Sequence, residues 1–153
     1  MVNTNQTGRR TTIQTAAMVV GAVFLLVGIL GFIPGVTSNY AALGAAGPAS
    51  EALLLGVFQV SILHNIVHLL FGVAGIVMAR SATQSRNYLI GGGALYLVLW
   101  LYGLVVPHDS SANFVPFNDA DDWLHLILGL GMVALGVVLA RGVTATRTTA
   151  RGL

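Results

Sequence analysis

The stretch Trp123–Arg141 reads WLHLILGLGMVALGVVLAR and contains no Asp, Glu, Lys or Arg before its final arginine. A helix needs about 20 apolar residues to cross the hydrocarbon core of a bilayer, so this stretch predicts a membrane span. Three other stretches of the chain have the same character. We predict four spans, near residues 13–33, 53–79, 88–106 and 123–140.

The composition of the whole chain is typical of a membrane protein. Of its 153 residues, 8% are charged and 56% are hydrophobic, and the mean hydropathy is +0.83. An average soluble domain has roughly 25% charged residues, so this chain has too little polar surface for a soluble enzyme or a disordered segment. The arginines form no basic face, so no nucleic-acid partner is predicted. Because the chain contains no cysteine, disulfides, thiol catalysis and Cys-ligated metals are excluded.

Arginines and acidic residues separate to opposite sides of the predicted spans. All seven arginines precede span 1, join spans 2 and 3 or follow span 4, and all five acidic residues fall in the other two loops. The positive-inside rule then predicts an up-down-up-down, all-α bundle of four transmembrane helices in a bacterial inner membrane, with both termini cytoplasmic. A single membrane domain at 13–141 lies between a cytoplasmic segment at 1–12 and a mobile basic tail at 142–153.

Two pairs of segments resemble each other. His64–Arg80 (HNIVHLLFGVAGIVMAR) aligns without a gap with His125–Arg141, with identity at 7 of 17 positions, and Gly21–Gly31 aligns with Gly93–Gly103. Both members of each pair cross the membrane in the same direction. We therefore predict two parallel helix-pair repeats, related by an axis along the membrane normal, with the leading histidines equivalent. The alternative explanation is the shared composition of membrane spans.

Small residues recur along the predicted spans and predict close helix contacts. In lipid no hydrophobic effect drives helices together, so association depends on close packing at small side chains. The predicted contact glycines are Gly28, Gly72, Gly75, Gly129 and Gly136.

Three histidines, His64, His68 and His125, lie in the outer part of the predicted spans. The first and the last are each 16 residues from the arginine that ends their span, or about 24 Å along a helix. Ionisable groups at this depth face protein or a water-filled cavity. We therefore expect spans 2 and 4 to be neighbours, with His68 and His125 facing the bundle interior.

Three roles are open for this group of histidines. The imidazoles can be structural, with hydrogen bonds to Asn65, Asp121, Asp122 or the backbone. They can instead bind a divalent metal such as zinc, or ligate haem or serve a proton or quinone path. The pattern of zinc hydrolases, which adds a Glu beside the first His, is absent, and no catalytic set is predicted. The candidate metal ligands are His64, His68, His125 and Asp121.

The acidic residues at the start of span 4 have a structural interpretation. Acids in the first turn of a helix oppose the positive end of its dipole, and Asn118 or Asp119 can cap it. Asp121 and Asp122 lie four and three residues before His125, within reach on the same helix face. We expect one of these carboxylates to pair with the imidazole in a structural role.

The sequence resembles a family of small membrane proteins. The resemblance is carried by Gly21–Gly28 (GAVFLLVG) with Gly31–Gly35 (GFIPG), by His64-Asn65-x-x-His68-Leu69-x-x-Gly72, and by Asn118-x-x-Asp121-x-x-Leu124-His125-Leu126-x-Leu128-Gly129. In these motifs the chain is similar to the four-span integral membrane proteins, mainly actinobacterial, that are catalogued only as a domain of unknown function. The resemblance implies a fold and a topology, and no reaction.

The sequence therefore predicts a protein in contact with the lipid bilayer, without a specific reaction. We expect a structural or accessory subunit that self-associates or joins a larger membrane complex. The alternative is a metal- or cofactor-binding membrane protein that uses the histidines of the outer leaflet, with zinc or haem as the candidate groups. No other cofactor is predicted.

Overall fold

The computed structural model describes residues 10–151, with side chains through Ala140. Three helices are long and apolar enough to cross a membrane, which agrees with a mostly helical membrane protein. The second helix has only 17 residues and a length of about 26 Å. The four α-helices are α1 (Thr12–Leu30), α2 (Ile62–Met78), α3 (Ala82–Val105) and α4 (Asp119–Arg151).

A small antiparallel sheet lies between α1 and α2, so the prediction of an all-α fold is wrong at this point. The helix expected from residue 53 begins only at Ile62, because the preceding apolar residues form strands. Periodicity alone cannot assign so short an apolar run, and Leu55 and Gly56, with φ of 53° and 72°, turn the chain between two strands. The sheet has the order β1-β2-β3, with β1 at Thr37–Ser38, β2 at Ala52–Leu54 and β3 at Phe58–Val60, and a 3-10 helix η1 at Tyr40–Ala42 follows β1.

Serine side chains determine where α2 and α3 begin. The Ser61 hydroxyl accepts a hydrogen bond from the His64 amide at 3.1 Å, and the Ser81 hydroxyl accepts one from the Gln84 amide at 3.2 Å. Such caps satisfy amides that have no partner within the helix, and each contributes about 1 kcal/mol. Because Ser81 caps α3, the turn after α2 is short, and α3 begins at Ala82 rather than near the predicted residue 88.

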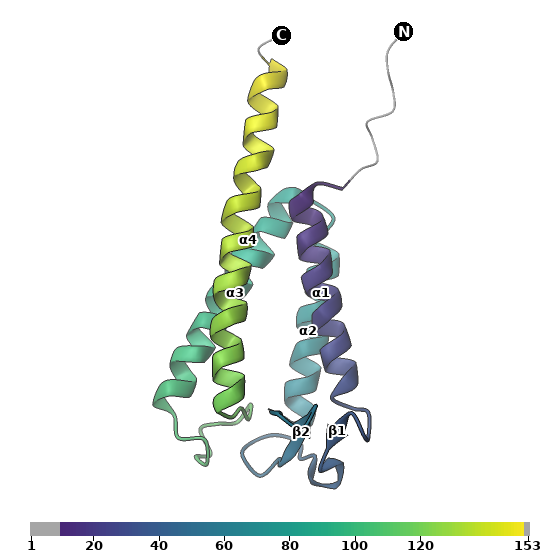
Figure 1. Cartoon of the computed structure of the whole chain (residues 1–153), viewed down its shortest axis with the longest axis vertical. Coiled ribbons are helices and arrows are strands. Elements are labelled where there is room, and N and C mark those ends of the chain that lie inside the picture. Colours follow the sequence, from purple (N-terminus) through teal and green to yellow (C-terminus); the bar gives the residue numbers. More distant parts are fainter. Residues whose placement is uncertain (1–9, 152–153) are drawn as a thin grey trace.

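The helices pack most extensively as two pairs of chain neighbours, α1 with α2 and α3 with α4. Figure 1 shows the start of α1 and the last turns of α4 at one end of the molecule and the strands at the other. We call this other end the sheet end. The expectation that the second and fourth spans are close neighbours is wrong, because α2 and α4 are not among the extensively packed pairs.

Glycines explain this pairing, because they bring the backbones of each pair into direct contact. A Cβ added at Gly72 would lie 2.6 Å from the Leu25 nitrogen, and one at Gly93 would lie 2.8 Å from the Gly129 carbonyl oxygen. No side chain fits at such positions without moving a backbone. The other predicted contact glycines would likewise place a Cβ within 3.0 Å of a neighbouring helix: Gly28, Gly75, Gly129 and Gly136.

The loop between α3 and α4 is fastened to the sheet region at the sheet end. The Gly47 amide donates to the Phe114 carbonyl at 2.8 Å, and the Asn118 side chain donates to the Val57 carbonyl at 2.8 Å. The α3–α4 loop and the chain around the sheet therefore form one layer across the ends of the helices, and this layer positions the polar residues described next.

Candidate metal centre

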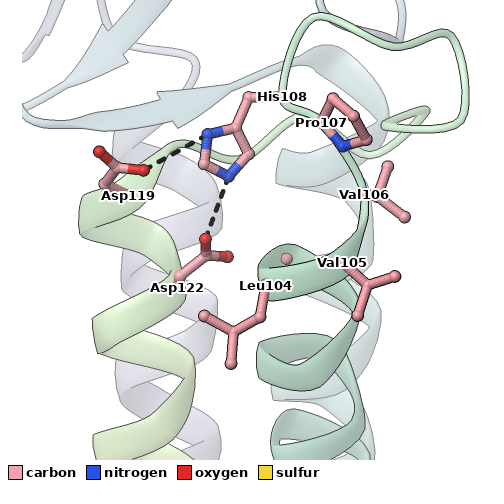
Figure 2. Close-up of a pocket in the computed structure, with 8 residues that line it drawn as sticks. Leu104, Val105, Val106, Pro107, His108, Asp119 and Asp122 are labelled. Carbon is pink, nitrogen blue, oxygen red and sulfur yellow. Dashed lines mark hydrogen bonds and ion pairs between the residues drawn. The ribbon is translucent and has the colours of Figure 1, made fainter.

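An imidazole and two carboxylates meet at the sheet end, between the end of α3 and the start of α4 (Figure 2). His108 Nε2 lies 3.0 Å from Asp122 Oδ2, and His108 Nδ1 lies 3.4 Å from Asp119 Oδ1. One donor atom from each residue lies within 4.8 Å of the other two, and among the described residues this is the one group of three or more that could hold a metal ion. We call these three residues the His-Asp-Asp cluster.

The two aspartates are placed by the cap of α4. The Asn118 side-chain oxygen accepts hydrogen bonds from the amides of Ala120 and Asp121, both at 3.1 Å. The sequence predicted either Asn118 or Asp119 as the cap of this helix, and in the structure the cap is Asn118. The helix therefore starts at Asp119, and the aspartates at positions 119 and 122 lie one turn apart on the same face, as residues three apart do.

The imidazole is placed by a buried asparagine within the α3–α4 loop. The side-chain Nδ2 of Asn113 donates hydrogen bonds to the backbone carbonyl oxygens of His108 and Phe117, at 2.9 and 3.2 Å. Asn113 is only 1% exposed, and its bond to Phe117 is shielded from water. The two bonds turn the loop back toward α4 and hold the backbone of His108 above the first turn of that helix.

A pocket of about 370 Å³ opens beside the His-Asp-Asp cluster and is lined by residues 103–108 together with both aspartates. Asp119 is almost fully exposed, whereas the side chain of Asp122 is 8% exposed. The second oxygen of Asp122, Oδ1, is buried without a hydrogen-bond partner among the described residues. It lies against Gly103, where an added Cβ would overlap it. A buried carboxylate oxygen without a donor is costly, and a cation would satisfy it.

The donor set suits a divalent transition metal. One imidazole nitrogen with carboxylate oxygens is a common zinc ligand set, whereas magnesium and calcium prefer oxygen ligands alone. Tetrahedral zinc with bonds of about 2.1 Å places its ligand atoms about 3.4 Å apart. Atoms of the cluster that lie up to 4.8 Å apart therefore need to approach by up to about 1.4 Å, which the exposed Asp119 side chain is free to do.

The four metal ligands predicted from the sequence do not form such a group. His64 Nδ1 lies 3.0 Å from the Pro116 carbonyl oxygen, and its ring lies 4.6 Å from that of His68. Asp121 Oδ2 accepts hydrogen bonds from the Gln59 and Asn118 amides, at 2.9 and 3.0 Å. Metal binding by the interior histidines stays a prediction.

The expected pairing of His125 with a neighbouring carboxylate is wrong. His125 Nδ1 has no hydrogen-bond partner among the described residues. Asp121 instead accepts from two backbone amides, and Asp122 accepts from His108. Backbone amides and the imidazole of His108 compete with His125 for the two carboxylates. Here the amides bind Asp121 and the His108 imidazole binds Asp122, so neither carboxylate pairs with His125.

The interior histidines lie among aromatic rings instead. His68 packs on Phe24 at 5.7 Å between ring centroids, and Phe24 packs on Tyr96 at 5.4 Å. Tyr96 and Phe117 each lie 5.2 Å from His125. His125 is 4% exposed, so the expectation that it faces the interior is confirmed, and the aromatic contacts join all four helices.

Asn65, the other residue of the predicted polar cluster, lies on α2 with its side chain against Gly31. It is fully buried, and neither polar atom of its side chain has a partner among the described residues. A Cβ at Gly31 would overlap this side chain. Asn65 therefore occupies a place beside a glycine at the end of α1, as Asp122 does beside Gly103 at the end of α3.

Sequence reasoning did not find the role of His108. The available signal was a histidine shortly after one span and two acids, three residues apart, at the start of the next. That signal is weak, because ten residues separate His108 from Asp119 and their path depends on the bonds of Asn113.

Comparison with known proteins identifies the family of the chain. Neither the curated proteins nor the solved structures gave a match. Residues 14–138 match a family described as Domain of unknown function (DUF4383), and this range includes all four helices except the first two residues of α1 and the last turns of α4. The chain therefore belongs to the DUF4383 family.

Proposed function

We propose that this chain is a membrane protein that binds a divalent transition-metal ion at its sheet end, through His108, Asp119 and Asp122. The observation that carries the proposal is the convergence of one imidazole and two carboxylates beside an open pocket. The buried, unpartnered Oδ1 of Asp122 adds a second, independent argument, because a cation would compensate it. The pocket admits water, which would complete the coordination shell.

Calorimetric titration of the full chain in detergent, after treatment with a chelator, tests this function. We expect one zinc ion per chain and no saturable magnesium binding. His108→Ala removes a ligand and Asp122→Asn replaces a carboxylate with an uncharged, weaker ligand, so each should weaken zinc binding by at least about tenfold. Asp109→Asn is the matched control, because Asp109 is an exposed acid in the same loop outside the cluster.

The same titration distinguishes this site from the interior histidines. His125→Gln should leave zinc affinity within about twofold of the unmodified chain, because this ring lies outside the His-Asp-Asp cluster. Zinc binding that survives His108→Ala and disappears in His125→Gln would contradict the proposal and favour the interior set.

We propose four spans in a bacterial inner membrane, with both termini cytoplasmic. The arginines support this orientation, because Arg10 precedes α1 while Arg80 and Arg86 flank the start of α3. All five acidic residues lie toward the opposite end: Glu51 and Asp109 are in the two connections, and Asp119, Asp121 and Asp122 are in the first turn of α4. Self-association and membership of a larger complex stay predictions.

Cysteine labelling in cells tests this orientation, since the chain has no native cysteine to interfere. Ser111 and Thr83 are exposed, in the α3–α4 loop and the first turn of α3. A membrane-impermeant maleimide should label Ser111→Cys in intact cells and should label Thr83→Cys only after the cells are lysed. The reverse pattern would show that the termini lie outside.

We propose that the two helix pairs are repeats, in a register four residues from the one the sequence alignment favoured. Gly72 lies against Gly21 in the first pair, as Gly129 lies against Gly93 in the second. This register aligns His68-Leu69-x-x-Gly72 with His125-Leu126-x-x-Gly129, so that His68 replaces His64 as the counterpart of His125.

In the same register, Asp122 of the metal site corresponds to the uncharged Asn65 in the first helix pair. Asn65 lies against Gly31, and Asp122 lies against Gly103 in the corresponding place. An amide is a weaker cation ligand than a carboxylate because it carries no charge. The repeat interpretation therefore places the cation site in the second helix pair alone.

A further inference from the structure

The turn between β2 and β3 presents large apolar side chains away from the protein. Leu55 is 63% exposed and Val57 is 48% exposed. Together with Gly56 between them, we call these residues the hairpin tip. No residue of the range 52–60 is charged. Side chains of this kind can lie in water, in lipid or against another chain, and the position and bonding of the hairpin distinguish these surroundings.

The sheet lies level with the last turn of a helix that is long and apolar enough to cross a membrane. That helix is α1, and its residues Val27 and Leu30 pack against the apolar cluster of the sheet. The cluster is formed by Ala52, Leu54 and Val60, so the inner face of the sheet is used for this contact. The hairpin tip is therefore close to the end of the membrane part of α1.

The length of α2 places the boundary of the hydrocarbon core at the same level. With 17 residues, α2 measures about 26 Å, whereas the hydrocarbon core is about 30 Å thick. The charge of Arg80, which follows α2 closely, keeps that end of the helix near the opposite boundary. The core would therefore extend about 4 Å beyond Ile62, the first residue of α2, and reach the hairpin.

The backbone amides of the hairpin tip have partners within the protein. A turn in water does not need such partners, because water satisfies its amides, whereas lipid offers none. The three amides, of Leu55, Gly56 and Val57, donate to the carbonyl oxygens of Val36, Leu53 and Leu54, at 2.9, 3.2 and 3.1 Å.

The outer edge of the hairpin is closed by the start of α4. The Val57 carbonyl oxygen accepts a hydrogen bond from the Asn118 side chain, and the Gln59 amide donates one to Asp121. Open sheet edges do not occur in contact with the hydrocarbon region, because their unpaired groups are costly there. These bonds therefore make the hairpin compatible with lipid.

The backbone conformation of Leu55 argues against water around its side chain. Its φ of 53° lies in the left-handed region, which glycine and asparagine adopt readily and leucine adopts only at a cost. A leucine here gains nothing from water. Transfer of its side chain into lipid is favourable and compensates this cost.

We propose that the hairpin tip is inserted into the membrane leaflet at the sheet end, with the side chains of Leu55 and Val57 among the acyl chains. The partner of this surface is the lipid itself, and the surface continues the lipid contact of the exposed face of α2. Trp123, near the start of α4, is 64% exposed and suits the adjacent interface, where tryptophan is enriched. The inserted hairpin completes the membrane crossing that α2 is too short to make alone.

Collision rates of a nitroxide spin label test this proposal, with the full chain, one per disc, in nanodiscs of dioleoylphosphatidylcholine. Oxygen concentrates among acyl chains, whereas the nickel chelate NiEDDA stays in water. Ser111→Cys, in the exposed α3–α4 loop, provides the water reference, and Leu70→Cys, 65% exposed on α2, provides the lipid reference. At Leu55→Cys and Val57→Cys we expect NiEDDA collisions at least about threefold less frequent than at Ser111→Cys, and oxygen collisions close to those at Leu70→Cys.

Two outcomes of this measurement would overturn the proposal. NiEDDA collisions as frequent as those at Ser111→Cys would show that the hairpin tip lies in water. Low collision rates with both reagents would show that protein covers it.

Leu55→Asn tests the proposal by the sign of its effect on stability. Asparagine adopts a positive φ more readily than leucine, so in water this change would raise the thermal midpoint. In lipid it places an amide among acyl chains and should lower the midpoint in the same nanodiscs by at least about 2 °C. A midpoint that is unchanged or raised would contradict insertion of the hairpin tip.

Discussion

Gly72→Ala is expected to reduce the stability of the folded chain in detergent by roughly 2 kcal/mol, or about 5 °C in the thermal midpoint. The added methyl carbon would lie 2.6 Å from the Leu25 nitrogen and 2.8 Å from the Gly21 carbonyl oxygen. Both are backbone atoms of α1, so the clash is relieved only if the two helices separate along the contact that holds the first pair together. Circular dichroism at 222 nm during heating measures the effect.

Gly91→Ala provides the control for this experiment. Gly91 is also a helical glycine, on α3, but a Cβ there would have no neighbour within 4 Å. Alanine favours the helix over glycine by about 1 kcal/mol, so this variant should be as stable as the unmodified chain or slightly more stable. Equal midpoints for the two variants would contradict the close approach of α1 and α2.

Asp121→Ala is expected to destabilise the protein by about 2–3 kcal/mol and to loosen the sheet from α4. The Oδ2 atom of Asp121, a residue only 3% exposed, accepts hydrogen bonds from the Gln59 amide in β3 and from the Asn118 amide. Removal of the carboxylate leaves both part-buried donors without this partner. Hydrogen exchange should therefore accelerate at the amides of Gln59 and Asn118 before any change in the membrane part of α4.

Two further variants show whether the hydrogen bonds cause this effect. Asp121→Asn keeps one acceptor oxygen and should recover part of the lost stability. Asp109→Ala removes an exposed acid of the same loop and should have no measurable effect. If exchange at Gln59 is unchanged in Asp121→Ala, this carboxylate does not hold the sheet.

The membrane character of the chain could be predicted because it depends on composition alone. Long intervals without charge specify helices that lipid can surround, whatever their neighbours. The sheet could not be predicted in this way. Residues 52–60 are apolar in the manner of a span, and their strands depend on the turn at Leu55 and Gly56 and on pairing with Thr37 and Ser38.

The candidate metal site was likewise predictable only in part. That polar side chains at the start of α4 would bind free amides there followed from helix geometry: Asn118 Oδ1 accepts from the Asp121 amide, and Asp121 Oδ2 accepts from the Asn118 amide. Helix geometry did not predict which group each carboxylate would bind. His108 is close in space because of the loop bonds of Asn113, which no local pattern reveals.

The sequence by itself determined the solvent of this protein, the approximate positions of its helices and the separation of its charges, because these properties depend on the transfer of each side chain between water and lipid. Tertiary structure alone decided which helices pair, where the sheet forms and which polar residues meet. The reason is physical: packing at Gly72 and Gly129, and the competition of amides and imidazoles for Asp121 and Asp122, depend on atoms distant in the chain that only the fold brings within a few ångströms.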